Sequence, residues 1–486
     1  MAKETGKLII QSSNKNYYFF FKGLFMMKCI KEIDESIFRG YDIRGIYGEN
    51  LNEDVSYTIG RSYGTILKQE YNSDKCIVGE DARSSSPLLS KALIQGITDS
   101  GVNVIYLGTV TSPMLYFANE ILNIHSGVIV TASHNPKEYN GFKIAYNVKG
   151  EICGDEIVDF KNFTLAGNFA SGTGIVSDYD IRDEYTKMIV SKFPFKKRLK
   201  VVVDSGNGTA SIIVHDIFDK LNLDVTYIYC DNNPDFPNHH PDPAEAENLK
   251  DLQVKVLEVG ADIGMAFDGD CDRVGCVDNK GRVISSDYYM AIMAKYILPN
   301  LSNKSVIFDV SCSKTLSEEI RKVGGIPVVY KTGNSYIKRE MLKQEMLFGG
   351  EISGHTFFKD KFYGFDDGIY AGLRMVEIVD DETVELSDVV DTLKKYYSTP
   401  VLKIVASDEK KAFIVEQVVE YCKNKGYNTN TVDGARPEFD DSFAIIRMSN
   451  TTPKLTVRFE AETEERLEEL KGEFLPIVND LISKYC

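Results

Sequence analysis

The stretch TASHNPKEYNGFK places a serine beside a histidine directly after the apolar run GVIV. We expect GVIV to be a buried strand, and open α/β sheets bind ligands beyond the carboxyl ends of their strands. Ser133 then has three interpretations: a nucleophile activated by His134, a carrier of phosphate, or a turn serine. The segment lacks the G-x-S-x-G elbow of a serine hydrolase. After a turn expected at Asn140-Gly141, FKIAY returns as a strand, which lets Lys143 face the same cleft as Ser133.

Three aspartates alternate in the stretch FDGDCDRVG. In an extended strand, Asp268, Asp270 and Asp272 would stand about 7 Å apart at successive positions, too far for one ion. A bend at Gly269 would bring the three carboxylates together as hard oxygen ligands suited to Mg²⁺. An EF-hand is excluded because its sixth position is Arg273 instead of glycine, and a solvated acidic turn is the alternative.

Further polar stretches have residue types that suit a sugar phosphate. FGGEISGHT alternates Glu351, Ser353 and His355, which can offer acceptors and donors to vicinal hydroxyls. RMSNTTPK precedes an expected strand and can surround a phosphate with guanidinium, hydroxyl and backbone N–H donors. Its candidate ligands are Arg447, Ser449, Asn450 and Thr451, and FRGYDIRG adds Tyr41 and Arg44. Each of these stretches, taken alone, is also compatible with an ordinary loop.

The composition is that of a globular protein, with 43% hydrophobic and 26% charged residues in a chain of 486. A formal charge of −16 argues against nucleic acid or an anionic membrane as a partner, because both need a basic surface. The nine cysteines include no C-x-x-C pair, which suits a reducing cytoplasm and offers no zinc framework. The apolar stretch YYFFFKGLFMM is short and interrupted by Lys22. We therefore interpret residues 1–26 as an extension outside the fold, with membrane association as a minor alternative.

The elements that must position these loops follow a repeated pattern. Strand, loop, helix and strand succeed one another from about residues 75, 199 and 303, with the first helix expected at 87–99. This pattern predicts three similar α/β domains in tandem, with mixed sheets. Near the C-terminus, two strands should flank the RMSNTTPK loop. A helix from about 463 should follow them, and Pro476 should kink or divide it.

We accordingly expect five segments arranged around a central cleft. They are an N-terminal extension (1–26), an α/β domain with the serine loop (27–180), an α/β domain with the aspartate loop (181–282), an α/β domain with the Glu351 loop (283–395), and a smaller α+β domain with the Arg447 loop (396–486).

Five motifs in the order YDIRG, TASHNPKEYNGFK, DGDCDR, GEISGH and RMSNTTP resemble the α-D-phosphohexomutase superfamily. The resemblance is strongest to its phosphomannomutase/phosphoglucomutase branch and covers about residues 36–486. It implies an isomerase that interconverts hexose 1-phosphate and hexose 6-phosphate, of mannose, glucose or both. The implied route runs through a phosphoserine enzyme and a hexose 1,6-bisphosphate, which also serves as activator.

The same resemblance implies roles for the residues above. Ser133 carries the phosphate, and its phosphoserine together with Asp268, Asp270 and Asp272 binds Mg²⁺. The implied catalytic residues beside Ser133 are Lys143, Arg44, Arg273 and His355. The implied substrate-binding residues are Tyr41, Lys331, Glu351, Ser353, Arg447, Ser449, Asn450 and Thr451. The partners are small-molecule sugar phosphates and neither nucleic acid nor membrane, and the enzyme is expected to be a cytoplasmic monomer or homodimer.

One position departs from the family pattern. In KTGNSYIK, relatives commonly carry histidine where this chain has Asn334. Asparagine does not titrate, so the general acid and base fall to His355, Lys143 or Tyr41. The alternatives are a phosphoglucosamine mutase, a catalytically weak phosphosugar-binding paralogue, and a phosphatase.

Overall fold

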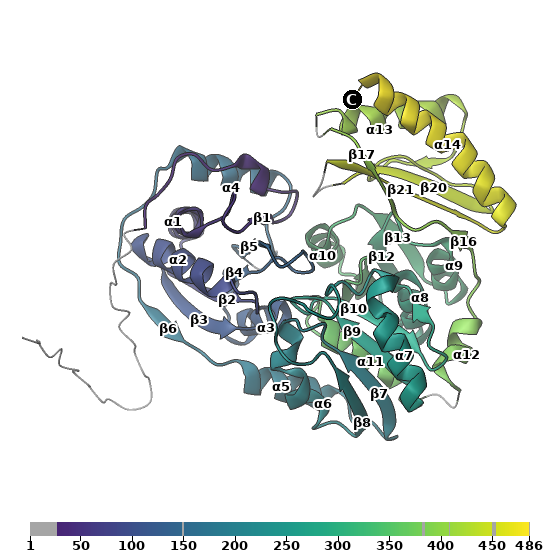
Figure 1. Ribbon diagram of the computed structural model, residues 1–486, viewed down its shortest axis with the longest axis horizontal. Helices are drawn as coiled ribbons and strands as arrows, with labels where there is room; N and C mark the ends of the chain where they lie inside the picture. The colour runs from purple at the N-terminus through teal and green to yellow at the C-terminus, as the bar shows by residue number, and fades with distance from the viewer. Residues whose placement is uncertain (1–26, 148–149, 382–383, 408, 450–452, 486) are drawn as a thin grey trace, which may run out of the picture.

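The computed structural model describes residues 27–147, 150–381, 384–407, 409–449 and 453–485. The expected extension, residues 1–26, and the candidate ligands Asn450 and Thr451 lie outside the described residues. Figure 1 shows four units that follow an arc, from the first sheet at the left to the C-terminal domain at the upper right. Within the described ranges, no helix combines the length and apolarity needed to cross a membrane.

The first unit is a six-stranded mixed sheet with strand order β1-β5-β4-β2-β3-β6. Its strands are β1 (Ile43–Ile46), β2 (Lys75–Glu80), β3 (Asn103–Thr109), β4 (Gly127–Val130), β5 (Tyr139–Ala145) and β6 (Val176–Asp178). Its helices are α1 (Glu53–Gln69), α2 (Ser86–Asp99), α3 (Ser112–Ile121) and α4 (Asp155–Ala166). The strand predicted at 127–130 and the helix predicted at 87–99 are therefore confirmed.

The turn predicted at Asn140-Gly141 is wrong. Both residues lie inside β5, where Asn140 pairs with Gly45 and Gly141 pairs with Arg44 of β1. The chain turns earlier, where the Tyr139 N–H donates to the Pro136 carbonyl. Gly141 allows β5 to lie close to β1, because a Cβ at this position would overlap the backbone of β1.

The second and third units are mixed sheets of the same kind. The second has strand order β11-β10-β9-β7-β8 and the third β13-β12-β14-β15. The second contains β7 (Leu199–Asp204), β8 (Leu223–Ile228), β9 (Ile263–Phe267), β10 (Val274–Asp278) and β11 (Val283–Ile284), with α5 (Arg182–Lys192), α6 (Val214–Phe218) and α7 (Lys250–Val259). The third contains β12 (Ser305–Asp309), β13 (Ile326–Tyr330), β14 (Phe348–Gly350) and β15 (Thr356–Phe358), with α8 (Ser286–Ile297), α9 (Lys314–Lys322), α10 (Asn334–Lys343), α11 (Gly368–Asp381) and α12 (Leu386–Asp391).

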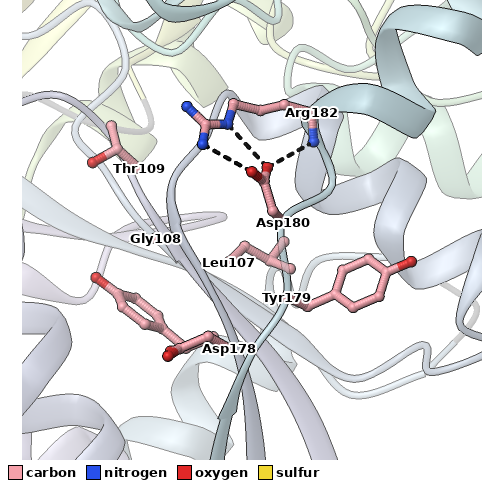
Figure 2. A pocket seen from close by; sticks show the side chains of 8 residues that line it. Leu107, Gly108, Thr109, Asp178, Tyr179, Asp180 and Arg182 are labelled. Atoms are coloured by element: carbon pink, nitrogen blue, oxygen red, sulfur yellow. Dashed lines mark hydrogen bonds and ion pairs between the residues drawn. The ribbon is translucent and has the colours of Figure 1, made fainter. Parts of the chain in front are cut away.

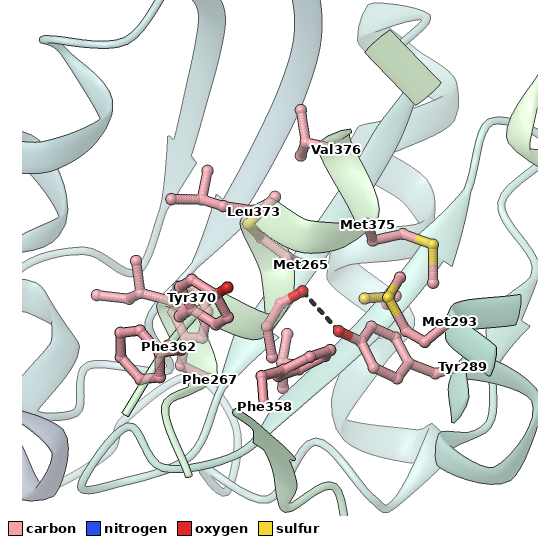
Figure 3. Packing of buried hydrophobic residues seen from close by; sticks show 14 of the residues in the cluster. Met265, Phe267, Tyr289, Met293, Phe358, Phe362, Tyr370, Leu373, Met375 and Val376 are labelled. Atoms are coloured by element: carbon pink, nitrogen blue, oxygen red, sulfur yellow. Dashed lines mark hydrogen bonds between the residues drawn. The ribbon is translucent and has the colours of Figure 1, made fainter. Parts of the chain in front are cut away.

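These two units share one apolar core. Met265 and Phe267 of β9 pack in the same buried cluster as Phe358 of β15 and Tyr370 of α11. Figure 3 shows this packing and the hydrogen bond from the Tyr289 hydroxyl to the backbone of α11. The aspartate loop follows β9 and the Glu351 loop follows β14. The same apolar core therefore supports both loops.

The C-terminal unit is the smaller α+β domain predicted from the sequence. It contains β16 (Tyr397–Ser398), β17 (Leu402–Val405), α13 (Lys411–Asn424), β18 (Thr429–Asn430), β19 (Arg436–Pro437), β20 (Ser442–Met448), β21 (Lys454–Ala461) and α14 (Glu464–Tyr485). Pro476 lies inside α14 without dividing it. Phe474 and Val478 are fully buried on either side of the proline and keep both halves of the helix packed on the sheet. The fold class predicted from the sequence, three mixed-sheet α/β domains and a smaller α+β domain, is confirmed.

Candidate functional site

The loop after β4 presents Ser133 in a strained backbone conformation. Ser133 has a φ of 49°, in the left-handed region. A residue other than glycine is strained there and stays in this conformation only where surrounding contacts stabilise it. That support comes from the guanidinium of Arg83, which is 2% exposed and donates to the carbonyls of Ser133 at 2.7 Å and Asn135 at 2.6 Å. Asp81 accepts the Arg83 Nε–H at 3.1 Å. Arg83 was not predicted from the sequence. The only indication of a functional loop there was the polar run GEDARSSS at the end of β2.

The three aspartates converge as predicted. One carboxylate oxygen from each of Asp268, Asp270 and Asp272 lies within 4.8 Å of the others, and all three side chains are buried. The Ser133 Oγ donates to Asp268 Oδ2 at 2.8 Å. Gly269 lies directly against the Ser133 carbonyl, where a Cβ would overlap the oxygen. The serine loop and the aspartate loop therefore touch without an intervening side chain.

One ammonium group partly neutralises this cluster. Lys143 Nζ lies 2.7 Å from Asp270 Oδ2 and 2.5 Å from Asp272 Oδ2. Ser112, at the start of α3, donates its hydroxyl to Asp270 Oδ2 at 2.6 Å. The buried Oδ1 atoms of Asp270 and Asp272 have no hydrogen-bond partner among the described residues. Hard oxygen donors left over in a buried, net negative cluster fit a divalent cation such as Mg²⁺.

The pKa shifts report the same excess of negative charge. Burial and the neighbouring carboxylates of Asp272 and Asp270 raise the pKa of Asp268 well above its usual range. Burial acts in the same direction on Asp270, but the Lys143 ammonium outweighs it and holds the pKa of that carboxyl below its usual value. The pKa of Lys143 is raised, because the two carboxylates it contacts outweigh the effect of its own burial.

A second buried cluster adjoins the aspartates. The Arg273 Nε–H donates to His355 Nε2 at 2.9 Å, which makes Nε2 an acceptor and places the histidine proton on Nδ1. His355 Nδ1 lies 2.7 Å from Asp366 Oδ2, and Lys338 Nζ lies 3.2 Å from Asp366 Oδ1. Asn334 Nδ2 lies 3.4 Å from the same carboxylate. Sequence reasoning missed Asp366, for which the pair of aspartates in GFDDG before α11 was the only signal.

The hairpin between β14 and β15 holds Glu351 in a buried position. Glu351 Oε1 accepts the Gly333 N–H at 2.5 Å, and the Ser353 hydroxyl lies 3.4 Å from Oε2. Burial raises the pKa of Glu351 to about 6. His355 contacts Arg273 instead. Of the three alternating residues Glu351, Ser353 and His355, the first two therefore lie together and His355 belongs to the cluster with Arg273 and Asp366.

The segment just before β1 and the first turn of α10 meet through aromatic rings. The Tyr41 ring lies 6.4 Å from the Tyr336 ring, and Lys331 Nζ sits 3.7 Å over the centre of the Tyr336 ring. Burial and nearby carboxylates raise the pKa of Tyr41 to about 12, which keeps it a neutral phenol near neutral pH. Arg44 donates to the side chain of Asn135, in the serine loop.

His134 approaches Ser133 less closely than Asp268 does. The distance from His134 Nδ1 to Ser133 Oγ is 3.4 Å. Burial, followed by the positive charges of Arg273 and Arg44, lowers the pKa of His134 well below its usual value.

The C-terminal domain brings Arg447 to the edge of this region. Arg447 Nε donates to Asp433 Oδ2 at 2.8 Å, and the same oxygen accepts the Thr332 N–H of the third unit at 3.0 Å. The carbonyl of Ser449 accepts a hydrogen bond from Lys411 at 2.8 Å. Asp433 is a further residue that sequence reasoning missed.

A separate hollow lies on the far edge of the first sheet, beside β3, β6 and the start of α5. Figure 2 shows that Asp178, Asp180 and Arg182 line it together with Leu107 and Thr109. Arg182 is already paired with Asp180. None of the site residues predicted from the sequence lines this hollow.

Four family models match the chain in succession. They are the phosphoglucomutase/phosphomannomutase α/β/α domain I at residues 35–159, domain II at 183–281, domain III at 285–396, and the C-terminal domain at 402–477.

Individual relatives agree with these matches. A phosphomannomutase/phosphoglucomutase of Pseudomonas syringae pv. tomato is 41% identical over 91% of this chain and 95% of the relative. A phosphoglucomutase of Neisseria gonorrhoeae is 38% identical over 92% of this chain and 97% of the relative. A crystal structure of a phosphoglucomutase/phosphomannomutase family protein from Burkholderia thailandensis superposes with a TM-score of 0.85 at 36% identity, covering 93% of this chain and 98% of that one. The chain belongs to the phosphoglucomutase/phosphomannomutase family, as its five motifs predicted.

Proposed function

We propose that this protein is a phosphohexomutase that interconverts hexose 1-phosphate and hexose 6-phosphate, of mannose, glucose or both. The observation that carries the proposal is the contact of Ser133 Oγ with Asp268 at 2.8 Å, at the point where three buried carboxylates converge. The names of the relatives at 41% and 38% identity support the same reaction.

The residues of the site would hold Mg²⁺ through Asp268, Asp270, Asp272 and an oxygen of phosphorylated Ser133. Bound there, the ion would offset negative charge during phosphoryl transfer. The protein's own cations also offset this charge, because Lys143, Arg44 and Arg273 surround the serine loop and the aspartates.

The phosphoryl group passes from Ser133 Oγ to the free hydroxyl of the bound sugar phosphate, forming a hexose 1,6-bisphosphate. The bond from phosphorus to Oγ breaks, the bond to the sugar oxygen forms, and the hydroxyl proton leaves to a base. After the bisphosphate reorients by about half a turn, its other phosphoryl group returns to Ser133. No redox cofactor is required by this sequence of steps.

Of the three candidate bases, His355 fits best. Lys143 is held protonated by two carboxylates, and the raised pKa of Tyr41 keeps it protonated. His355 Nε2 accepts the Arg273 Nε–H at 2.9 Å, so Arg273 would have to turn away before Nε2 takes up a proton. Asp366 faces Nδ1 and would then stabilise the imidazolium. We therefore assign the base to His355 and the orienting role to Asp366.

The remaining predicted residues would bind the sugar. We assign Glu351 and Ser353 to the 3- and 4-hydroxyls and the non-reacting phosphate to Arg447, Ser449, Asn450 and Thr451. Tyr41 and Lys331 are assigned to the substrate without a specified group. Glucose and mannose differ at C2, so contacts to O3 and O4 do not distinguish them. We accordingly expect both sugars to be substrates.

We keep the domain bounds predicted from the sequence, 27–180, 181–282, 283–395 and 396–486, and the four family matches support this division. We also place the enzyme in the cytoplasm, as a monomer or homodimer. The eight described cysteines are free thiols, which suits a reducing compartment.

A substrate panel tests the proposal. Glucose 1-phosphate, mannose 1-phosphate and glucosamine 1-phosphate are each supplied with Mg²⁺ and a trace of the corresponding 1,6-bisphosphate, and the 6-phosphate product is measured. We expect turnover of the glucose and mannose compounds, and one phosphate by intact mass that Ser133→Ala loses. Activity on glucosamine 1-phosphate alone would instead indicate a phosphoglucosamine mutase. Release of inorganic phosphate in excess of isomerised product would indicate a phosphatase, and no turnover of any substrate would indicate the binding paralogue.

A further inference from the structure

One carboxylate joins the C-terminal domain to the third domain at the site. Asp433 lies on the turn between β18 and β19, next to Gly434, whose φ is 108°. A Cβ at Gly434 would lie 2.9 Å from the Cα of Arg447, so only glycine lets this turn press against β20. The carboxylate of Asp433 is thereby delivered to the base of the Arg447 side chain.

Asp433 Oδ2 accepts two hydrogen bonds, one from each domain. Arg447 Nε donates at 2.8 Å from the C-terminal domain, and the Thr332 N–H donates at 3.0 Å from the third domain. The contact is shielded from water, since the Arg447 side chain is 7% exposed and that of Asp433 is 16% exposed. The next amide along the chain, that of Gly333, donates to Glu351. Arg447 is therefore linked to Glu351 through the Asp433 carboxylate and the consecutive backbone amides of Thr332 and Gly333.

We propose that Asp433 is a positioning residue that sets the separation between the phosphate-binding arginine and the hydroxyl-binding glutamate. The inference rests on the proposed function, in which Arg447 holds the non-reacting phosphate and Glu351 the sugar. Both half-reactions need the phosphate and the hydroxyls held at one spacing, whichever end of the sugar reacts. Asp433 thus contributes equally to ground-state and transition-state binding, and its loss raises KM and leaves kcat nearly unchanged.

The chain offers a matched control at the same domain interface. Lys394 of the third domain pairs with Glu462 of the C-terminal domain on the surface, where their side chains are 40% and 42% exposed. Glu462→Gln removes this interdomain pair without touching Asp433, Thr332 or Arg447. Any effect of a generally loosened interface would appear in both variants.

The experiment measures kcat and KM for glucose 1-phosphate in the full chain carrying Asp433→Ala, Asp433→Asn or Glu462→Gln. We expect KM to rise about tenfold in Asp433→Ala, the loss of one charge-assisted contact, with kcat within threefold of the parent. In Asp433→Asn the amide oxygen still accepts both donors, so KM should rise only about threefold. Glu462→Gln should stay within twofold, because exposed ion pairs contribute little.

Three results would overturn the proposal: a KM within twofold of the parent in Asp433→Ala, a fall in kcat at unchanged KM, or an equal rise of KM in Glu462→Gln. Calorimetric binding of glucose 1-phosphate to the Ser133→Ala chain, with and without Asp433→Ala, tests the inference without turnover. A dissociation constant about tenfold weaker with Asp433→Ala supports it, and an unchanged constant refutes it even if the parent proves inactive. Thermal unfolding identifies a variant that fails to fold, in which case Asp433→Asn carries the test.

Discussion

The contact between Gly269 and Ser133 predicts a large effect for the smallest possible substitution. In Gly269→Ala, the new Cβ would overlap the Ser133 carbonyl oxygen, and the two loops would have to separate by about 1 Å to restore ordinary contact. The oxygen cannot yield cheaply, because Arg83 holds it at 2.7 Å and Ser133 already has a φ of 49°. Overpacking of this kind costs about 1–3 kcal/mol of stability. Displacing a reacting atom by about 1 Å lowers the rate about 100-fold.

The assay compares kcat for glucose 1-phosphate and the midpoint of thermal unfolding in Gly269→Ala and in a matched glycine control. Gly472 lies inside α14, and apart from its chain neighbours and the helix backbone no atom lies within 4 Å of the position that a Cβ would occupy. Gly472→Ala should therefore leave kcat unchanged and stabilise the helix by about 1 kcal/mol. A kcat for Gly269→Ala within threefold of the parent would refute the reasoning that direct contact of the two loops positions Ser133.

Three further predictions concern residues around the same site. Arg83→Lys cannot reproduce the forked contacts to the Ser133 loop, so kcat and the rate of phosphoenzyme formation, followed by intact mass, should each fall at least about tenfold; equal rates would contradict the clamp. Burial raises the pKa of Glu351 from 4.5 to about 6, so the folded state binds the proton more tightly and the parent loses stability as pH rises from 4.5 through 6. Glu351→Gln should remove this dependence and be more stable than the parent by about 2 kcal/mol at pH 8 but not at pH 4, by urea unfolding; a difference independent of pH would contradict the assignment. Asn334→His places a titratable ring beside the Asp366 carboxylate, which should raise the pKa of the new histidine and add an ionisation to the pH–rate profile that the parent lacks; superimposable profiles would show that position 334 is not coupled to the base.

Much of the fold could be predicted from local patterns. The boundaries of α2 and β4 followed from short-range periodicity and turn residues, and the buried face of α14 followed from helical spacing. These features depend on residues a few positions apart, whose spacing is visible in the chain itself. The turn predicted at Asn140-Gly141 was wrong because the partner strand of β5 is β1, about 100 residues earlier, and its pairing leaves no local signal.

The sequence by itself determined the chemical groups of this site: Ser133, the three alternating aspartates with a glycine between the first two, and the order of the loops that carry them. The tertiary structure decided which groups meet. Ser112 reaches Asp270 across 158 positions, Arg83 reaches Ser133 across 50, and Asp433 reaches Thr332 across 101. A lone arginine, serine or aspartate in a loop has no periodicity and no fixed spacing to its partner, so its role becomes defined only when the tertiary fold, within one domain or between two, brings the pair together.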